Sequence, residues 1–339
     1  MRQWPTTATG NAKVQAFVVP RKAAWLLAAA IVSASLPAFA QSYPSRPIKM
    51  VVPFTPGTSM DVVARAVGAK LTERLGQPVV VDNRPGATGT IGTDAVAKAE
   101  PDGYTLLVTS SNIVVAPHLL KSVPFNPLTD FAPITVSSYS AMTLAVSNKS
   151  GFKTVAELMA YAKANPGKLN YSSPGIGTTQ HISMEALKNV AGVDIVHVPY
   201  RGSAGALTDI VGGQVNLGFV PVDLAAPQHA AGSLKILAVG SPTRHKMLPD
   251  VPTLQESGIP GIESNPWHAF AAPKGTPRPI IEKLNSEIRA ILDLPDVRKS
   301  LEGHGLVISP GSPEDMLALM QRDWTSSQEV IRRNKISID

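Results

Sequence analysis

The chain has 339 residues and no cysteine. Disulfide bonds, thiolate catalysis and a lipid-anchored cysteine are therefore excluded. The sequence also lacks the motifs G-x-S-x-G, H-E-x-x-H and G-x-x-x-x-G-K-S/T, which mark common hydrolases, zinc proteases and phosphate-binding loops. Its seven histidines are scattered, with no pair at ligand spacing on one predicted helix, so we expect neither a metal nor another cofactor.

The sequence gives little support for nucleotide or nucleic-acid binding. Gly86, Gly89 and Gly92 are spaced G-x-x-G-x-x-G, unlike the G-x-G-x-x-G of dinucleotide-binding loops. The formal net charge is +6, but four of the 31 Lys and Arg residues precede residue 41, where no Asp or Glu occurs. The remaining 27 basic residues nearly balance the 25 acidic ones, so no basic face is left for nucleic acid.

The first 40 residues have the pattern of a secretory signal. Arg21-Lys22 precedes a short apolar core at about 23–36, and Ala38-Phe39-Ala40 has the form of a cleavage site. A membrane anchor needs roughly 20 apolar residues, more than this core provides. We therefore expect residues 1–40 to be removed near Ala40 and the mature chain to be exported to the periplasm.

A strand, a loop and a helix follow one another around residues 51–61. Apolar residues at 48–52 indicate a buried strand, which Pro53 and Pro56-Gly57 end. Thr58 or Ser59 can cap the next helix, with Asp61 in its first turn. A helix N-terminus after a glycine-containing loop directs unpaired N–H groups and a positive dipole end to one point. We therefore expect this loop to bind an anion.

The mature chain alternates strands and helices, which predicts an α/β fold with parallel, helix-covered sheets. It is too long for one core, so we expect two lobes. Successive strands at 134–136 and 142–146 mark the crossing into the second lobe, and a strand at 267–272 crosses back. Lobe 1 is then 41–140 and 263–339, and lobe 2 is 141–262. Other strands are expected at 78–81, 104–109, 169–172, 195–198, 215–220 and 234–240. Helices are expected at 58–75, 154–164, 178–190, 204–211, 279–292 and 313–333. A further helix follows the glycine-containing loop at 83–89 and ends at Ala99.

The second lobe contains a similar loop at 171–181. Ser173-Pro174-Gly175 looks like the counterpart of Thr55-Pro56-Gly57, and a helix again follows. If both loops lie at the carboxyl ends of their sheets, they face each other across the cleft. An anion held there would contact both lobes.

Other candidate ligand contacts stand at strand ends. Ser111 closes the third strand, Tyr200 and Arg201 close the strand at 195–198, and Asp223 follows the strand at 215–220. Each has an ordinary alternative: Arg201 can be solvated and Asp223 can cap a helix. Trp267 can line the cleft or fill the hinge.

Two further alternatives concern His181 and catalysis. His181 stands in the first turn of its helix and can contact a ligand, act as a cap or face solvent. A hydrolase site of Ser173, His181 and Asp61 is conceivable, since such groups meet in space. Because no nucleophile motif accompanies them, we expect no enzyme.

Eight blocks of the sequence together resemble the Bug-type solute-binding receptors of tripartite tricarboxylate transporters. They extend from Tyr43 to Thr253 and are spread over the mature chain. The blocks are Tyr43-Pro44-Ser45-Arg46-Pro47-Ile48, Val52-Pro53-Phe54, Pro56-Gly57 to Asp61, Asn83-Arg84-Pro85-Gly86, Pro101-Asp102-Gly103-Tyr104, Ala162-Lys163-Ala164-Asn165-Pro166-Gly167-Lys168-Leu169-Asn170-Tyr171, His197-Val198-Pro199-Tyr200 and Leu248-Pro249-Asp250-Val251-Pro252-Thr253.

The resemblance implies a type II periplasmic binding-protein fold with a carboxylate ligand between its lobes, and two integral membrane subunits as partners. We expect the chain itself to be a monomer. Carried over by motif, the resemblance points to ligand contacts at Thr55, Gly57, Thr58, Ser59 and Asp61 in the first lobe, and at Ser173, Gly177, Thr178 and His181 in the second.

Two departures from the family pattern concern specificity. The family usually has Pro-Gly-Gly where this chain has Pro56-Gly57-Thr58, and a side chain there disfavours a positive φ or narrows the pocket. Many relatives carry a polar residue after Phe219, where this chain has the apolar Val220 and Pro221. We expect a receptor for a small organic acid; the alternative is a sensor subunit that binds the same ligand and signals to a regulator.

Overall fold

The computed structural model describes residues 43–200, 202–333 and 336. The predicted signal segment, residues 1–40, and the candidate Arg201 lie outside the described residues. From Pro44 onward, the described residues form one compact unit. None of the helices in the described part combines the length and apolar character needed to span a bilayer.

The first sheet has six strands in the order β11-β4-β10-β3-β1-β2. Three run parallel, as predicted: β1 (Ile48–Val52), β2 (Val79–Asn83) and β3 (Thr105–Ser110). The sheet as a whole is mixed, because β10 (Trp267–Pro273) is antiparallel to both β3 and β4 (Phe131–Ser140), and β11 (Leu306–Ile308) is antiparallel to β4. β10 arrives from the other sheet rather than from a crossover helix, and this sets its direction.

The second sheet has five strands in the order β7-β6-β8-β5-β9. It repeats the pattern of the first, with three parallel strands and one antiparallel strand beside them. The antiparallel strand, β5, enters from the first sheet and also pairs with β9. The strands are β5 (Met142–Ser147), β6 (Asn170–Ser173), β7 (Val196–Pro199), β8 (Leu217–Pro221) and β9 (Leu234–Val239).

The helices near both sheets include most of those predicted and three that were missed. α4 and α8 contain an internal proline, at Pro117 and Pro227, which obscures a helical pattern, and α10 is short and polar. The helices are α2 (Ser59–Leu75), η1 (Ala87–Gly89), α3 (Thr90–Ala97), α4 (Asn112–Leu119), η2 (Asn148–Ser150), α5 (Val155–Ala164), α6 (Thr179–Ala191), α7 (Ser203–Gly212), α8 (Val222–Ala230), α9 (Arg278–Leu292), α10 (Pro295–Gly303) and α11 (Pro313–Arg333).

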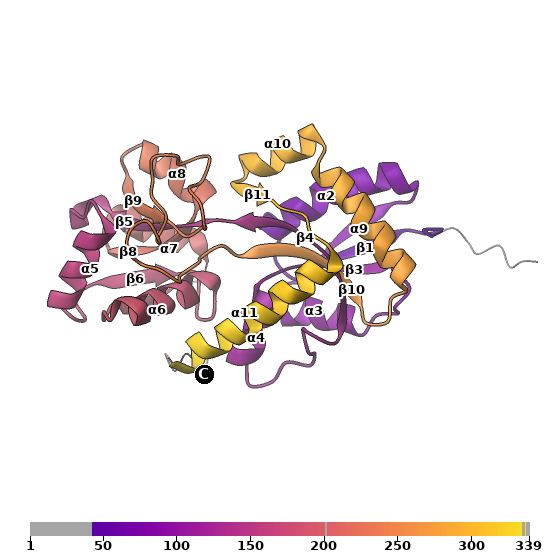
Figure 1. Cartoon of the computed structure of the whole chain (residues 1–339), viewed down its shortest axis with the longest axis horizontal. Coiled ribbons are helices and arrows are strands. Elements are labelled where there is room, and N and C mark those ends of the chain that lie inside the picture. The colour runs from indigo at the N-terminus through magenta and orange to yellow at the C-terminus, as the bar shows by residue number, and fades with distance from the viewer. Residues whose placement is uncertain (1–42, 201, 334–335, 337–339) are drawn as a thin grey trace, which may run out of the picture. The chain divides into compact units, whose positions relative to one another are not determined.

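Two segments connect the sheets, and they run side by side (Figure 1). One passes directly from β4 to β5 and the other leads from β9 to β10. Their backbones bond to each other: Ser140 N–H donates to Pro266 O at 2.9 Å and Met142 N–H donates to Ser264 O at 3.0 Å. The predicted points of crossing thus fall where the chain changes sheets. The exact lobe boundaries stay a prediction.

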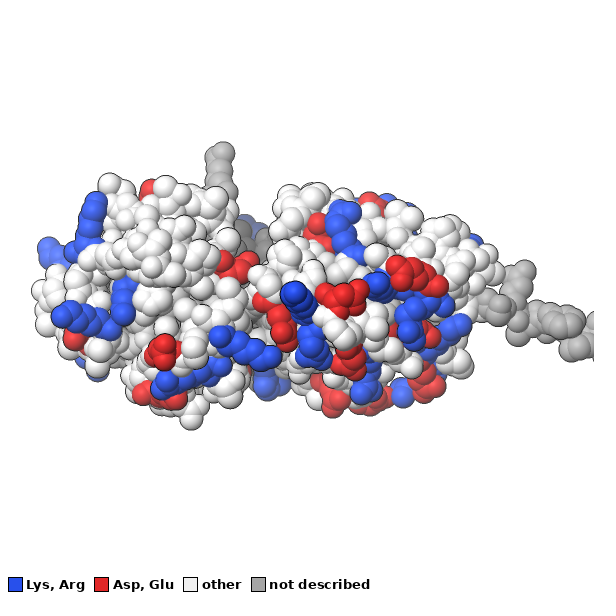
Figure 2. Space-filling view, turned by 90° about the horizontal axis from the view of Figure 1, so that it is seen from above, with Lys and Arg blue, Asp and Glu red and all other residues white. Residues whose placement is uncertain are grey.

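Each sheet has its own apolar core. Val51, Leu107 and Trp267 pack with Met316 and Met320 of α11 on the first sheet. A separate cluster around Leu144, Tyr171 and Met184 fills the second. On the face shown in Figure 2, acidic and basic side chains are interspersed. This agrees with the near balance of charge in residues 41–339.

Candidate functional site

The loop between β1 and α2 is held by two local hydrogen bonds. Gly57 has φ +84°, and its N–H donates to Asp61 Oδ2 at 3.0 Å. The Thr58 hydroxyl donates to Thr55 O, three residues back, at 3.1 Å. Thr58 is the N-cap residue of α2, with φ −73° and ψ 159°. The predicted start of the helix is therefore confirmed, although the Thr58 side chain bonds backwards and does not cap it.

Asp61 is buried beneath this loop with 4% of its surface exposed. Besides Gly57, its carboxylate accepts from Arg65 Nε at 2.9 Å and Asn83 Nδ2 at 3.0 Å. Burial raises the pKa of Asp61, but the hydrogen bonds from Arg65, Gly57 and Asn83 outweigh it, and the pKa lies below its ordinary value. We interpret Asp61 as the residue that holds the loop, because all its contacts serve that purpose.

Replacing Asp61 by alanine is expected to lower the free energy of unfolding by about 2–3 kcal/mol, since the buried Asp61 carboxylate no longer accepts the hydrogen bonds from Gly57, Arg65 and Asn83. Urea unfolding followed by circular dichroism measures this. Arg65→Gln is the matched control. The Arg65 side chain is 54% exposed, so its loss is expected to cost less than about 1 kcal/mol. Equal losses of stability in the two variants would show that Asp61 stabilises the protein through its ion pair with Arg65 and not by holding the loop.

The loop between β6 and α6 has the same conformation. Gly177 has φ +79°, and the N-cap residue Thr178 has φ −71° and ψ 158°. The Gly177 N–H donates to His181 Nδ1, four residues ahead, at 3.0 Å. The Thr178 hydroxyl donates to Gly175 O, three residues back, at 2.8 Å. The second lobe thus repeats the first loop with His181 in the place of Asp61.

This repeat corrects the pairing predicted from the sequence. The Pro-Gly pairs of the two loops suggested that Ser173-Pro174-Gly175 corresponds to Thr55-Pro56-Gly57. In the structure Gly57-Thr58 corresponds to Gly177-Thr178, two residues further along. The Pro-Gly sequences are similar, but they do not determine the loop conformation. That conformation depends on the glycine with positive φ that directly precedes the N-cap residue of the helix.

Both helix starts leave backbone donors available. The first-turn N–H groups of a helix have no carbonyl four residues back. Among the described residues, no side chain caps α2, and at α6 the Thr178 hydroxyl is 3.5 Å from His181 N. The N–H groups of Ser59 and Met60 in α2, and of Thr179 and Gln180 in α6, can therefore bind an anion. Neither loop contains Lys or Arg, so binding relies on these dipoles and hydroxyls.

The structure does not assemble the hydrolase site. Ser173 is fully buried, and its hydroxyl lies 2.7 Å from Nε2 of His197, not of His181. The same Oγ accepts from Gly175 N at 3.2 Å. Asp61 and His181 are each committed to a glycine N–H in their own loop. Ser173 is therefore an internal support of its loop and has no exposure as a nucleophile.

His181 is neutral in this arrangement. Burial lowers its pKa to about 4, and the neighbouring His197 adds to the effect. The hydrogen bond from Gly177 requires an unprotonated Nδ1, so the ring proton is on Nε2. Both loops are thus electrically neutral overall, because Asp61 is paired with Arg65 and His181 carries no charge.

Two further candidates, Ser111 and Tyr200, lie near the loops through their backbones. The Ser111 N–H donates to Trp267 O at 3.1 Å at the carboxyl end of β3, and the next residue, Asn112, accepts from Thr179 Oγ1 at 3.4 Å. Ser111 is thus beside a contact between α4 and the start of α6. Tyr200 N–H donates to Ser173 O at 2.9 Å, so Tyr200 stands next to the second loop.

The side chains of Tyr200, Asp223 and Trp267 have structural roles. The Tyr200 hydroxyl donates to Asp209 at 2.5 Å, and burial together with that bond raises its pKa to about 12. Asp223 is in the first turn of α8 and lies close to the turn at Gly305, where an added Cβ would be 3.1 Å from Asp223 Cβ. Trp267 is 1% exposed and belongs to the core of the first sheet. Within residues 43–200 and 202–333, no hydrogen bond or ring contact joins these three side chains to the helix starts, and a role of Tyr200 and Asp223 as ligand contacts stays a prediction.

Sequence reasoning missed the residues that support the site. Asn83 donates to both Phe54 O and Asp61, and Arg65 donates to both Asp61 and Asn83. The spacing of Asp61 and Arg65, four apart on a helix, was the available signal. Ala87 and Thr88 have positive φ, and Gly89 lies against the Phe54 ring. No sequence signal marks such a strained turn.

Thr58 does not strain the backbone, because its φ is negative and the positive φ belongs to Gly57. Of the two effects expected for the departure from Pro-Gly-Gly, only a narrower site remains. Thr58→Gly is expected to cost about 0.5–1 kcal/mol of stability through a more flexible unfolded chain, and to shift binding towards bulkier acids. Thermal unfolding and a comparison of dissociation constants across carboxylates measure the two effects. Thr58→Ser, which keeps the hydroxyl, is the control; unchanged ligand preference in the glycine variant would contradict the prediction.

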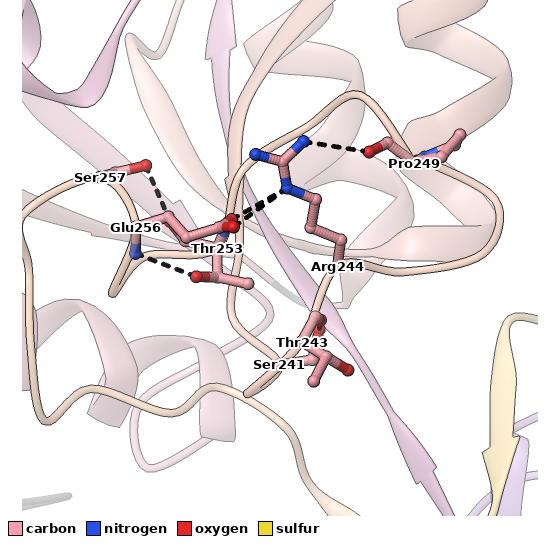
Figure 3. A network of polar contacts seen from close by, with 7 residues as sticks. All are labelled: Ser241, Thr243, Arg244, Pro249, Thr253, Glu256 and Ser257. Carbon is pink, nitrogen blue, oxygen red and sulfur yellow. Dashed lines mark hydrogen bonds and ion pairs between the residues drawn. The ribbon is translucent and has the colours of Figure 1, made fainter.

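A hollow of about 490 Å³ lies away from both loops, after β9. Its polar groups satisfy each other (Figure 3). Arg244 Nε donates to both oxygens of Glu256, at 3.2 and 3.0 Å, and Arg244 Nη1 donates to Pro249 O at 3.3 Å. Glu256 also accepts from Thr253 N at 2.8 Å. These bonds fix the turns of the segment 241–257, and we assign no ligand to it. No cluster of metal-binding side chains occurs in the residues that the structure covers.

Comparison with known proteins identifies relatives along nearly the whole mature chain. The model of the family described as "Tripartite tricarboxylate transporter family receptor" matches residues 63–336. A protein from Pseudomonas sp. (strain P51), described as "UPF0065 protein in tcbD-tcbE intergenic region", is 40% identical over 291 residues, covering 86% of this chain and 87% of that protein.

Three solved structures are similar to the chain. Rpa4515 of R. palustris with adipate has a TM-score of 0.77 and 35% identity, covering 87% of this chain and 99% of that one. The periplasmic binding protein BugD has a TM-score of 0.74 and 35% identity, with 87% and 99% covered. MatC from Rhodopseudomonas palustris with bound malate has a TM-score of 0.74 and 32% identity, with 85% and 100% covered.

The comparisons confirm the expected fold, that of a type II periplasmic binding protein, and the resemblance to Bug-type receptors. The family is one of transport receptors and not of enzymes. The chain belongs to the tripartite tricarboxylate transporter receptor family.

Proposed function

We propose that the mature chain is a periplasmic receptor that captures a small organic acid between its two loops and delivers it to the membrane subunits of a tripartite tricarboxylate-type transporter. The observation that carries the proposal is the repeated loop: Gly57–Asp61 and Gly177–His181 share backbone angles and hydrogen bonds, and each ends at a helix start with free donors. Two similar proteins have adipate and malate as ligands in their structures.

The ligand contacts we propose are the backbone N–H groups at both helix starts and the hydroxyls of Ser59 and Thr179. Thr55, Thr58 and Thr178 line the approach, while Asp61, Ser173 and His181 hold the loops behind it. Two helix starts with three or four charge-assisted hydrogen bonds can give about 8 kcal/mol net, which corresponds to about micromolar affinity. The absence of Lys and Arg from both loops favours a ligand that is also held by its shape.

A thermal-unfolding screen of carboxylates tests the proposal. At a hundredfold excess over the dissociation constant, a true ligand adds about 2.7 kcal/mol to the free energy of unfolding. Adipate and malate are the first probes, with adipamide and malamide as matched neutral controls. We expect a carboxylate to stabilise the protein and its amide not to do so. Stabilisation by no carboxylate, or equal stabilisation by the amides, would contradict anion capture.

Export and partnership have separate tests. The proposed signal peptide predicts a mature protein that begins at about residue 41, which intact-mass measurement of the exported chain determines. Delivery predicts that cells with the transporter subunits but without this chain lose uptake of the identified acid. Uptake that continues unchanged would favour a role in sensing. We expect the receptor to be a monomer, which sedimentation measures.

A further inference from the structure

The second loop rests on a stack of three rings. Tyr171 of β6 lies parallel to His197 of β7, with centroids 4.7 Å apart and planes 19° apart. His197 in turn lies parallel to His181 of α6, with centroids 4.1 Å apart and planes 11° apart. Tyr171 is fully buried, His181 is 6% exposed and His197 is half-buried. Two imidazoles in face-to-face contact and shielded in part from water disfavour positive charge on either ring.

His181 has a specific reason to remain neutral. Its Nδ1 accepts the Gly177 N–H at 3.0 Å, so the single proton of the neutral ring is on Nε2. A second proton can bind only to Nδ1. Protonation of His181 and the hydrogen bond that holds Gly177 therefore exclude each other. The first loop has no such property, because Asp61 accepts the Gly57 N–H as a charged carboxylate.

His197 contacts both ends of the second loop. Its Nε2 lies 2.7 Å from Ser173 Oγ at the start of the loop, and its ring stacks on His181 at the end. Ser173 Oγ also accepts from Gly175 N at 3.2 Å and donates to Gly175 O at 3.0 Å. A change in the position or charge of His197 is therefore transmitted to Ser173, to Gly175 and, through His181, to Gly177.

We propose that His197 is a positioning residue that holds the second loop in its ligand-binding conformation, and that a proton on His181 releases this loop and so weakens ligand binding in acid. The proposal rests on the proposed function of the loop. It concerns how the loop is held and does not add a ligand contact.

The other charged and titratable groups that face the two imidazoles are Tyr171, Glu185 and Lys188. The Tyr171 hydroxyl donates to Glu185 Oε1 at 2.7 Å, and Lys188 Nζ donates to the same oxygen at 2.7 Å. Glu185 favours and Lys188 disfavours a proton on each imidazole, so their effects oppose each other. The neighbouring strand β8, Leu217–Pro221, carries no titratable side chain. Burial is the largest influence and lowers both imidazole pKa values, that of His181 to about 4.

A ligand-free nuclear magnetic resonance titration of the full mature chain tests how the loop is held. We expect the Gly177 amide proton to move with pH at the same midpoint as the His181 ring nitrogens, well below the midpoint of an ordinary histidine. In His197→Gln, His181 loses the neighbouring imidazole that opposes its charge, so both midpoints are expected to move up together. A Gly177 amide that does not follow His181 in the wild type would overturn the proposal without any variant.

A binding experiment tests the consequence for the ligand. One proton taken up on loop release weakens affinity by at most about tenfold per pH unit. With adipate or malate as probe, the ratio of dissociation constants at pH 4 and 7.5 is expected to be about twofold larger in wild type than in His181→Gln, because an imidazole with a pKa of about 4 is half protonated at pH 4. The glutamine amide oxygen accepts from Gly177 without titrating. Protonation of the probe itself cancels in this comparison. Equal ratios would overturn the acid release.

The two experiments separate this proposal from the proposed function. The ring and amide titrations need no ligand, so a failure to bind adipate and malate counts against the function alone. A titration that fails while a carboxylate still binds counts against the positioning role alone. His304→Gln, at an exposed site outside the stack, is expected to match wild type in both experiments.

Discussion

Replacing Trp267 by alanine is expected to lower the free energy of unfolding by about 4 kcal/mol, at the upper end for buried side chains. Trp267 is 1% exposed and packs with Val51 and Leu107 of the sheet and Met316 and Met320 of α11. Alanine leaves a large cavity in this cluster. The substitution also removes the donor of Trp267 Nε1, which bonds to Asp323 Oδ2 at 2.8 Å.

Trp267→Phe separates packing from hydrogen bonding. Phenylalanine keeps most of the apolar volume and loses only the hydrogen bond to Asp323. Asp323 keeps its ion pair with Arg322, whose Nε lies 2.9 Å from Asp323 Oδ1. We expect it to cost about 1–2 kcal/mol, much less than alanine. Urea unfolding by circular dichroism avoids the loss of a fluorescent probe. Similar losses of stability in the two variants would show that Trp267 stabilises the protein mainly through its hydrogen bond to Asp323 and not through packing.

Trp267→Ala is also expected to weaken ligand binding, through the backbone next to Trp267. Its carbonyl accepts the Ser111 N–H at 3.1 Å, and the next residue, Asn112, contacts Thr179 at the start of α6. Without the indole packing of Trp267, the start of β10 is expected to be less rigid, and with it the start of α4. Trp267→Ala is therefore expected to raise the dissociation constant more than Trp267→Phe does.

The sequence predicts most strands and long helices because their signals are local. Ile48–Val52 is a short apolar run with breakers behind it, and α9 and α11 have clear apolar faces. Strand direction is not local. β10 reads like any buried strand, and only its arrival from the other sheet makes it antiparallel. α4 and α8 carry internal prolines that a helix tolerates here because of its surroundings.

The candidate site divides in the same way. Gly57-Thr58 and Gly177-Thr178 could be recognised as strand-to-helix loops from glycine and a capping residue. Their supports could not be recognised, because Asn83 comes from another strand and His197 reaches Ser173 across a sheet. The resemblance to Bug-type receptors pointed to Asp61 and His181 as ligand contacts, and this stays a prediction. The hydrogen bonds from Gly57 and Gly177 show that each side chain also supports its own loop.

The protein is expected to lose about 6 kcal/mol of stability between pH 6.5 and pH 4 through two buried histidines. Burial lowers the pKa of His268, which is 3% exposed, to about 4, and that of His181 to about 4. An unfolded histidine has a pKa of about 6.5. Between these values the unfolded chain binds more protons than the folded one, so stability rises with pH. The contribution is complete above about pH 6.5 and is lost as the pH falls towards 4.

Each lowered pKa corresponds to about 3 kcal/mol, a large share of the 5–15 kcal/mol typical of a folded protein. Asp61 affects stability over a different pH range. Because its pKa is lowered in the folded protein, its contribution to stability is lost only as the pH falls below the ordinary pKa of a carboxyl group. Urea unfolding at pH 7.5, 6, 5 and 4.5 follows the change. His268→Gln is expected to remove about half of the slope, with Ser138, 3.2 Å from His268 Nδ1, able to bond the amide instead.

His268 lies in β10 of the first sheet and His181 lies in α6, beside the second sheet, so their effects are expected to add. His268 is on β10 and contacts Ser138 in the core of the first sheet, whereas His181 supports the second loop. His181→Gln should therefore flatten both the stability curve and the acid dependence of ligand binding, while His268→Gln should flatten the first alone. The exposed His304→Gln should flatten neither. If His268→Gln changed the acid dependence of binding as much as His181→Gln, global unfolding and not release of the loop would account for the loss of ligand in acid.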